Sequence, residues 1–109
     1  MDRPSRYILT SDGTPVPCES LIAWALWIEN SDEERQVARD ELPGGSEVNT
    51  VFLALDYNWG DGPPVLFETM VFGGPHDRLV KRYTTRAEAL AGHARIVAEL
   101  RGIAASMAN

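Results

Sequence analysis

The sequence predicts an α+β fold, in which an antiparallel sheet of four to five strands packs with two helices in the order β-α-β-β-β-β-α. The first observation behind this prediction is a pair of segments rich in β-branched and aromatic residues, 48–56 and 65–72. The second is the loop between them, whose glycines and prolines exclude one continuous helix. The third is a helical pattern at residues 21–29 and another at 85–100.

The two central segments do not alternate cleanly between apolar and polar side chains. Thr50 and Phe52 fall on one face of the first segment, and Val51 and Leu53 fall on the other. We therefore expect both faces of this strand pair to be covered. The charged segment at residues 35–42 is expected to form an edge strand, because charged side chains discourage a foreign strand from pairing with the sheet edge. The flanking strands are expected at residues 6–9, 35–42 and 79–83.

The first helix is expected at Leu21–Glu29, with Ser20 as its N-cap. Its apolar side chains lie on nearly every side instead of forming a single stripe. Two interpretations stay open. Either the helix is buried, or one of its faces, with Trp27, contacts a partner chain.

The second helix begins with a capping box, Thr85-Arg86-Ala87-Glu88, in which Thr85 accepts a hydrogen bond from the Glu88 amide and Glu88 reaches back to Thr85. We expect it to run to about Leu100. Gly92 is placed on the solvent stripe, where it either permits a close approach or is simply tolerated. The side chains expected to face inward are Ala87, Leu90, Ala91, Ala94, Val97 and Ala98.

Length and composition restrict the class of protein. With 109 residues the chain is expected to form a single domain over residues 1–109, frayed at 1–5 and 102–109. A net charge of -6 disfavours binding to nucleic-acid phosphates. A lone cysteine, Cys18, excludes an internal disulfide and a cysteine zinc cluster. There is no apolar run of the ~20 residues that span a bilayer, nor a signal-peptide core, so we expect a cytoplasmic protein without membrane contact.

The loop after the first central segment carries Asp56, Asn58, Trp59 and Asp61. It starts like a calcium-binding EF-hand loop, but Asp61 occupies the required glycine position and Phe67 stands where the final glutamate should be. We therefore expect a turn in which Asp and Asn side chains bond their own backbone. Trp59 at the tip is either exposed, as an anchor for a partner, or folded back over a sheet edge.

No set of residues predicts a catalytic, cofactor or metal site. The spacing does not link His76 with His93, and no histidine can be placed beside Cys18. Glu68 interrupts an apolar strand and needs a partner, which we expect to be Arg39, Lys81 or Arg82 on a neighbouring strand. A functional acid at Glu68 is the alternative.

Several segments together resemble one family. They are DGTPVP, WALWIE, TVFLALDYNWGDGPPVLFETMVFGG and RYTTRAEALAGH, and the pattern is similar to that of a family of small uncharacterised proteins from bacteriophages and prophages. The resemblance spans residues 7–93 and implies no reaction or cofactor. Tyr57 stands where other members often have histidine, which weighs further against an enzyme.

Three functions follow as expectations. The first is a non-enzymatic phage or prophage accessory protein in the cytoplasm of a bacterial host. It would bind protein through Trp59, Asn58, Asp61 and Trp27, as a homodimer or by interfering with a host or defence protein. The second is a virion or assembly component. The third is a small hydrolase or metal-dependent enzyme, with candidate residues Asp56, Asn58, Asp61, Glu68 and His76.

Overall fold

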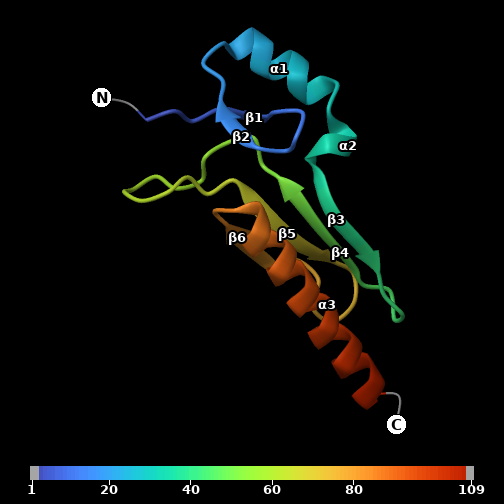
Figure 1. Ribbon diagram of the computed structural model, residues 1–109. Helices are drawn as coiled ribbons and strands as arrows, with labels where there is room; N and C mark the ends of the chain where they lie inside the picture. The colour runs from blue at the N-terminus through green and yellow to red at the C-terminus, as the bar shows by residue number, and fades with distance from the viewer. Residues whose placement is uncertain (1–2, 108–109) are drawn as a thin grey trace.

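A computed structural model describes residues 3–107 and confirms the α+β class (Figure 1). A four-stranded antiparallel sheet has the order β3-β4-β5-β6, and a separate two-stranded sheet pairs β1 with β2. The short strand β2 and the single-turn helix α2 were not predicted. In chain order the elements are β1 (Tyr7–Leu9), β2 (Pro15–Pro17), α1 (Leu21–Glu29), α2 (Asp32–Arg35), β3 (Gln36–Glu41), β4 (Glu47–Phe52), β5 (Phe67–Phe72), β6 (Val80–Tyr83) and α3 (Arg86–Met107).

The long helix α3 lies across one face of the four-stranded sheet, and α1 lies beyond the far end of that sheet, next to β1 (Figure 1). Burial alternates along the central strands: Thr50 and Phe52 are buried, whereas Val51 stays half-buried and Phe72 exposed. The expectation that both faces of the central pair are covered was therefore wrong. One face is packed by α3, and the other is open, as antiparallel sheets allow.

Strand β4 ends at Phe52, earlier than the apolar run in the sequence predicted. The cause is Ala54, which adopts a left-handed conformation with φ 63 and breaks the pleat. This turn points the Ala54 carbonyl at two donors, the Tyr7 amide at 2.9 Å and the Trp24 indole at 3.0 Å. Both hydrogen bonds tie the end of β4 to the β1 and α1 layer.

Helix α3 begins at the predicted place but differs in its end and its inner face. It continues to Met107, past the predicted end near Leu100 and into the stretch expected to fray. Gly92 is buried against Tyr83 instead of facing solvent. The approach is close, since a Cβ on Gly92 would lie 2.3 Å from the Tyr83 hydroxyl. The side chains that do face the sheet are Ala89, His93, Ile96, Val97 and Leu100, whereas Ala87, Leu90, Ala91, Ala94 and Ala98 are exposed.

At the N-terminus, the Ser5 carbonyl accepts a hydrogen bond from the Asp56 amide, and Arg3 forms an ion pair with the Asp56 carboxylate. The outermost residues of both predicted frayed ends lie outside the described range 3–107.

The core consists of two apolar clusters along the sheet. The larger one joins β1, β4, β5 and the start of α3, with Phe52 and Phe67 fully buried in it. The smaller one lies towards the C-terminal end of α3 and contains Val48, Val71 and Val97. The molecule is elongated, with extents of 55 × 31 × 22 Å.

Candidate functional site

The loop from Asp56 to Val65, here called the Trp59 loop, is organised by one buried carboxylate. The Asp56 side chain is 3% exposed, and its Oδ1 accepts hydrogen bonds from the Asn58 amide at 2.7 Å and the Val65 amide at 2.9 Å. The two ends of the loop are therefore fastened to one group. The Arg3 guanidinium lies 3.0 Å from the other Asp56 oxygen and also donates to the Gly60 carbonyl. No pattern in the sequence predicts that Arg3 contacts this loop.

Asn58 fastens the loop from inside. Its side-chain amide donates to the carbonyls of Asp61 and Pro63, and its Oδ1 accepts from the Gly60 amide at 3.0 Å. The expected Asp and Asn side-chain turn is confirmed. Since its polar atoms are bonded within the loop, Asn58 serves here as a scaffold for Trp59.

Trp59 stands at the tip of this loop with 89% of its surface exposed. It does not fold back over a sheet edge. Asp61, two residues further on, is also exposed. The loop thus presents one indole and one carboxylate on a backbone held by side-chain hydrogen bonds, which lowers the ordering cost of any contact made there.

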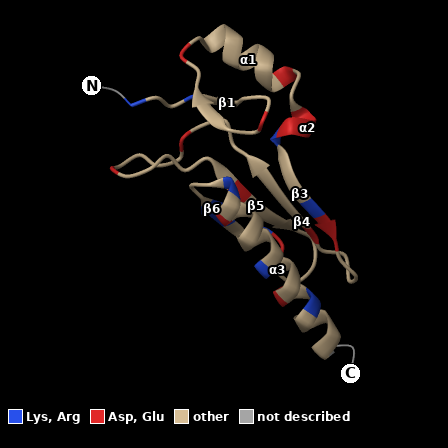
Figure 2. Ribbon diagram, in the orientation of Figure 1, with Lys and Arg blue, Asp and Glu red and all other residues tan. Residues whose placement is uncertain are grey.

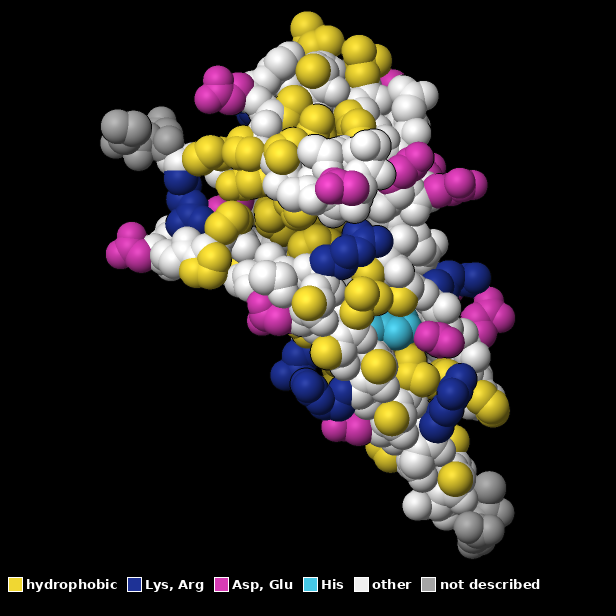
Figure 3. Space-filling view, in the orientation of Figure 1, with side chains coloured by type: hydrophobic (Ala, Val, Ile, Leu, Met, Phe, Trp, Pro, Cys, Tyr) yellow, Lys and Arg dark blue, Asp and Glu magenta, His cyan; other side chains and the backbone are white. Residues whose placement is uncertain are grey.

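Helix α1 is not buried, so the first of its two interpretations was wrong. None of its residues is buried, and Leu21, Ile22 and Leu26 are 60%, 73% and 54% exposed. We call these three side chains the α1 apolar face. Figure 3 shows hydrophobic side chains in yellow over α1.

Trp27 lies on the inner side of α1. Its ring meets Phe52 edge-on, with centroids 5.9 Å apart and an interplanar angle of 85°. Trp24 also points inward and donates to the Ala54 carbonyl. These two rings attach α1 to the core, so the outward apolar surface of the helix comes from the aliphatic residues and not from Trp27.

A chain of polar side chains crosses the core between α3 and the sheet. His93 Nε2 lies 2.7 Å from Asp40 Oδ2, His93 Nδ1 lies 2.7 Å from Thr50 Oγ1, and Thr50 is bonded in turn to Thr69. An acid, an imidazole and a hydroxyl in this order are the groups of a hydrolytic triad. Here, however, Thr50 and Thr69 are 0% exposed and His93 is 5% exposed, so no substrate reaches the hydroxyl. His93 is therefore a core residue.

The remaining candidates lie apart. Glu68 forms the predicted strand-to-strand ion pair, with Arg82 Nε 2.9 Å away, and Arg82 also lies over the Tyr57 ring. His76 is in the turn between β5 and β6, at the opposite end of β5 from the Trp59 loop. The hydrolase candidates are thus not brought into one place. Within residues 3–107, no three His, Cys, Asp or Glu side chains are grouped as metal ligands.

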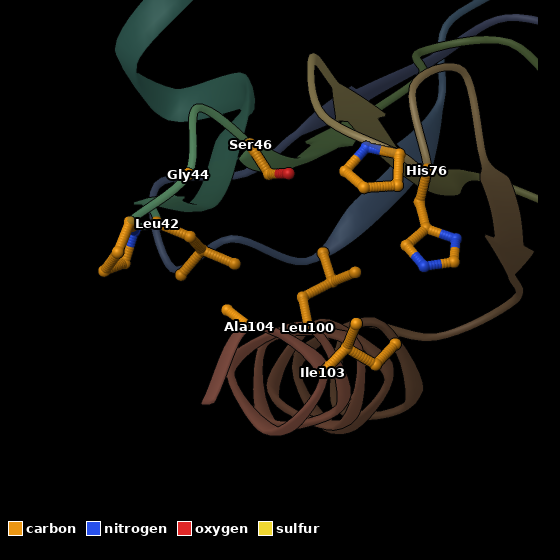
Figure 4. A pocket seen from close by; sticks show the side chains of 9 residues that line it. Leu42, Gly44, Ser46, His76, Leu100, Ile103 and Ala104 are labelled. Carbon is orange, nitrogen blue, oxygen red and sulfur yellow. The ribbon is translucent and has the colours of Figure 1, made fainter. Parts of the chain in front are cut away.

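A hollow on the described surface lies at the other end of the sheet. It has a volume of about 300 Å³ and is formed by the β3–β4 turn, the β5–β6 turn and the last turns of α3 (Figure 4). We call it the C-terminal hollow. Its lining is mainly apolar, with Leu42, Leu100, Ile103 and Ala104, and His76 lies at one side. No pattern in the sequence predicted this hollow, because the helix was expected to end near Leu100, before Ile103.

Among residues 3–107, Lys and Arg side chains do not gather into one basic surface. Figure 2 shows Lys and Arg dispersed over β3, β6 and α3, whereas acidic residues gather on α2, at Asp32, Glu33 and Glu34. Within residues 3–107, no helix combines the length and the apolar character needed to cross a membrane. No family model matches the chain, and the searches of curated proteins and of solved structures also return no match.

Proposed function

We propose that the protein acts by binding another protein through the α1 apolar face, as an accessory protein of the phage or prophage type in the cytoplasm of a bacterial host. The observation that carries the proposal is the exposure of Leu21, Ile22 and Leu26 on a helix without a single buried residue. Large apolar side chains exposed together on one helix are typical of a protein interaction site. The resemblance to phage proteins makes a host protein the expected partner.

Charge around the helix restricts what the partner looks like. Glu19 and Glu29 stand at the two ends of α1, and the acidic helix α2 follows directly. An apolar ridge with carboxylates at its ends fits an apolar groove bordered by Lys or Arg. Binding by this surface should weaken as salt concentration rises, because the rim charges are solvent-exposed.

The experiment places a photo-crosslinking amino acid at Ile22 and, as a matched control, at Leu90, an exposed leucine on α3. Expression in a bacterial host should yield a crosslinked host protein at position 22 that is missing at position 90. With that protein purified, Ile22→Glu combined with Leu26→Glu should weaken binding by about 30-fold or more. Identical products at both positions, or unchanged affinity of the double variant, would contradict the proposal.

A further inference from the structure

The C-terminal hollow has a mainly apolar lining and the volume of a small pocket. Its volume of about 300 Å³ is at the lower limit of small-molecule pockets, and the side chains of Leu42, Leu100 and Ile103 converge on it (Figure 4). The two turns that form its wall are in close contact, because the Ser46 hydroxyl donates to the Gly73 carbonyl. A Cβ on Gly73 would lie 2.4 Å from the Gly45 carbonyl oxygen, so this wall has little room to collapse into the hollow.

The chain itself presents a side chain of that size. Trp59 is 89% exposed, the highest value among the exposed large apolar side chains of the described residues, and the loop that carries it is fastened through Asp56 and Asn58. An exposed tryptophan on a preorganised loop has the properties of a binding anchor. The polar neighbours also match, because the Asp61 carboxylate beside Trp59 can accept a hydrogen bond from the His76 imidazole at the side of the hollow.

Trp59 cannot enter the hollow of its own chain. The Trp59 loop lies beyond the end of β4, whereas the hollow lies where β4 begins, beside Ser46. The six residues of β4 separate the two features by about 20 Å. The indole of one molecule can therefore reach only the hollow of another.

The total surface agrees with such an association. The chain exposes 7024 Å², whereas a monomer of 12.0 kDa is expected to expose about 6,000 Å². Its radius of gyration is 15.7 Å, against about 13 Å for a compact domain of this length. The excess, about 1,000 Å², is comparable to the roughly 800 Å² that each partner contributes to a standard interface.

We propose that the protein self-associates head to tail, with Trp59 of one molecule inserted into the C-terminal hollow of the next. Such a contact is heterologous, because each molecule has Trp59 at one end and the C-terminal hollow at the other. Assembly therefore gives either a closed ring or an open filament. The proposal is separate from the α1 apolar face, and either can fail without the other.

The first experiment is light scattering over a range of protein concentrations. The wild type should rise from the 12.0 kDa monomer to larger assemblies. Trp59→Ala should weaken association by about 30-fold or more, because it removes the anchor. Ala104→Phe, which fills the hollow, and Ile103→Glu, which makes it polar, should do the same. The controls are Leu90→Ala and Ala98→Glu, exposed positions on α3 away from the hollow, and circular dichroism checks that each variant is folded.

Mixing the variants gives the decisive result. Trp59→Ala retains an intact hollow, and Ala104→Phe retains an intact anchor, so an equimolar mixture can form one contact only. We expect a dimer of twice the monomer mass and nothing larger, although each variant alone is monomeric. A wild type that stays monomeric at every concentration would overturn the proposal. So would variants that still associate, or a mixture of folded monomeric variants that forms no dimer.

Discussion

Trp27 and Trp59 differ in how much of the indole ring is in contact with the protein. Trp27 packs edge-on against the fully buried Phe52, whereas Trp59 is 89% exposed. We expect Trp27→Ala to lower the free energy of unfolding by about 2–4 kcal/mol, because it leaves a gap under α1. Trp59→Ala should change it by less than about 0.5 kcal/mol. Urea denaturation of both variants measures this, and equal losses would contradict the assignment of Trp27 to the core.

At the scale of the residue, the sequence predicted some contacts well and others not at all. The pairing of Glu68 was foreseeable, because a carboxylate inside an apolar strand needs a cation on a neighbouring strand. Trp59 was correctly placed at a loop tip, but its exposure was left open. The left-handed conformation of Ala54 could not be predicted from the sequence, because alanine rarely adopts it. Tertiary contacts with Tyr7 and Trp24 impose it.

At the scale of the element, Gly92 shows how a neighbouring strand decides the face of a helix. A Cβ at this position would lie 2.4 Å from the Tyr83 ring, whereas nothing lies within 4 Å of a Cβ at Gly102 in the same helix. We expect Gly92→Ala to destabilise the protein by about 1–3 kcal/mol despite the better helix propensity of alanine. Gly102→Ala should stabilise it by up to about 1 kcal/mol. Thermal unfolding of both variants tests the pair, and stabilisation by Gly92→Ala would contradict the close approach.

The start of α3 gives a prediction on pH. The Thr84 hydroxyl, and after it that of Thr85, donates to the Glu88 carboxylate and lowers the pKa of Glu88 from its ordinary value of 4.5. The Glu88 carboxylate therefore binds a proton less readily in the folded protein than in the unfolded chain. The contribution to stability is complete above pH 4.5 and is lost as the pH falls through the lower pKa of the folded state.

Urea denaturation from about pH 6 to about pH 3 measures this contribution. Glu88→Gln keeps the capping geometry but does not titrate, so its stability should fall less over this range than that of the wild type. Glu99→Gln on the exposed side of α3 changes the net charge equally and serves as the control. If Glu88→Gln and Glu99→Gln reduce the pH dependence of the free energy of unfolding equally, the hydrogen bonds that Glu88 accepts at the start of α3 do not cause it.

The limits of sequence-based prediction for α3 have a physical cause. Its start was predicted because a capping box is local chemistry between residues three apart. Its end was not, because Gly102 follows Leu100 where a glycine stop would end a helix, yet α3 runs through Gly102 to Met107. Its inner face was assigned from the alanine pattern, but the bulk of Tyr83 and the hydrogen bonds of His93 determine which side packs on the sheet.

At the scale of the whole molecule, the polar chain lies between the two apolar clusters. Along β4, Val48 belongs to the smaller cluster and Phe52 to the larger, with Thr50 between them; Thr69 has the same place in β5, and His93 lies opposite them on α3. A shift of one strand by two residues would place a hydroxyl inside an apolar cluster without a partner. The layer of Thr50, Thr69 and His93 therefore favours a single register of strands and helix.

Substitutions in this layer separate stability from register. His93→Leu alone should cost about 1–3 kcal/mol, because Thr50 and Asp40 lose a shared partner. Adding Thr50→Val and Thr69→Val makes the layer apolar, so the triple variant should recover to within about 1 kcal/mol of the wild type in urea denaturation. Its amide NMR spectrum should then show extra or broadened peaks on β4, β5 and α3, from alternative registers. A triple variant less stable than His93→Leu would contradict the stability argument, and a single sharp set of peaks would show that the polar layer is not needed to define the register.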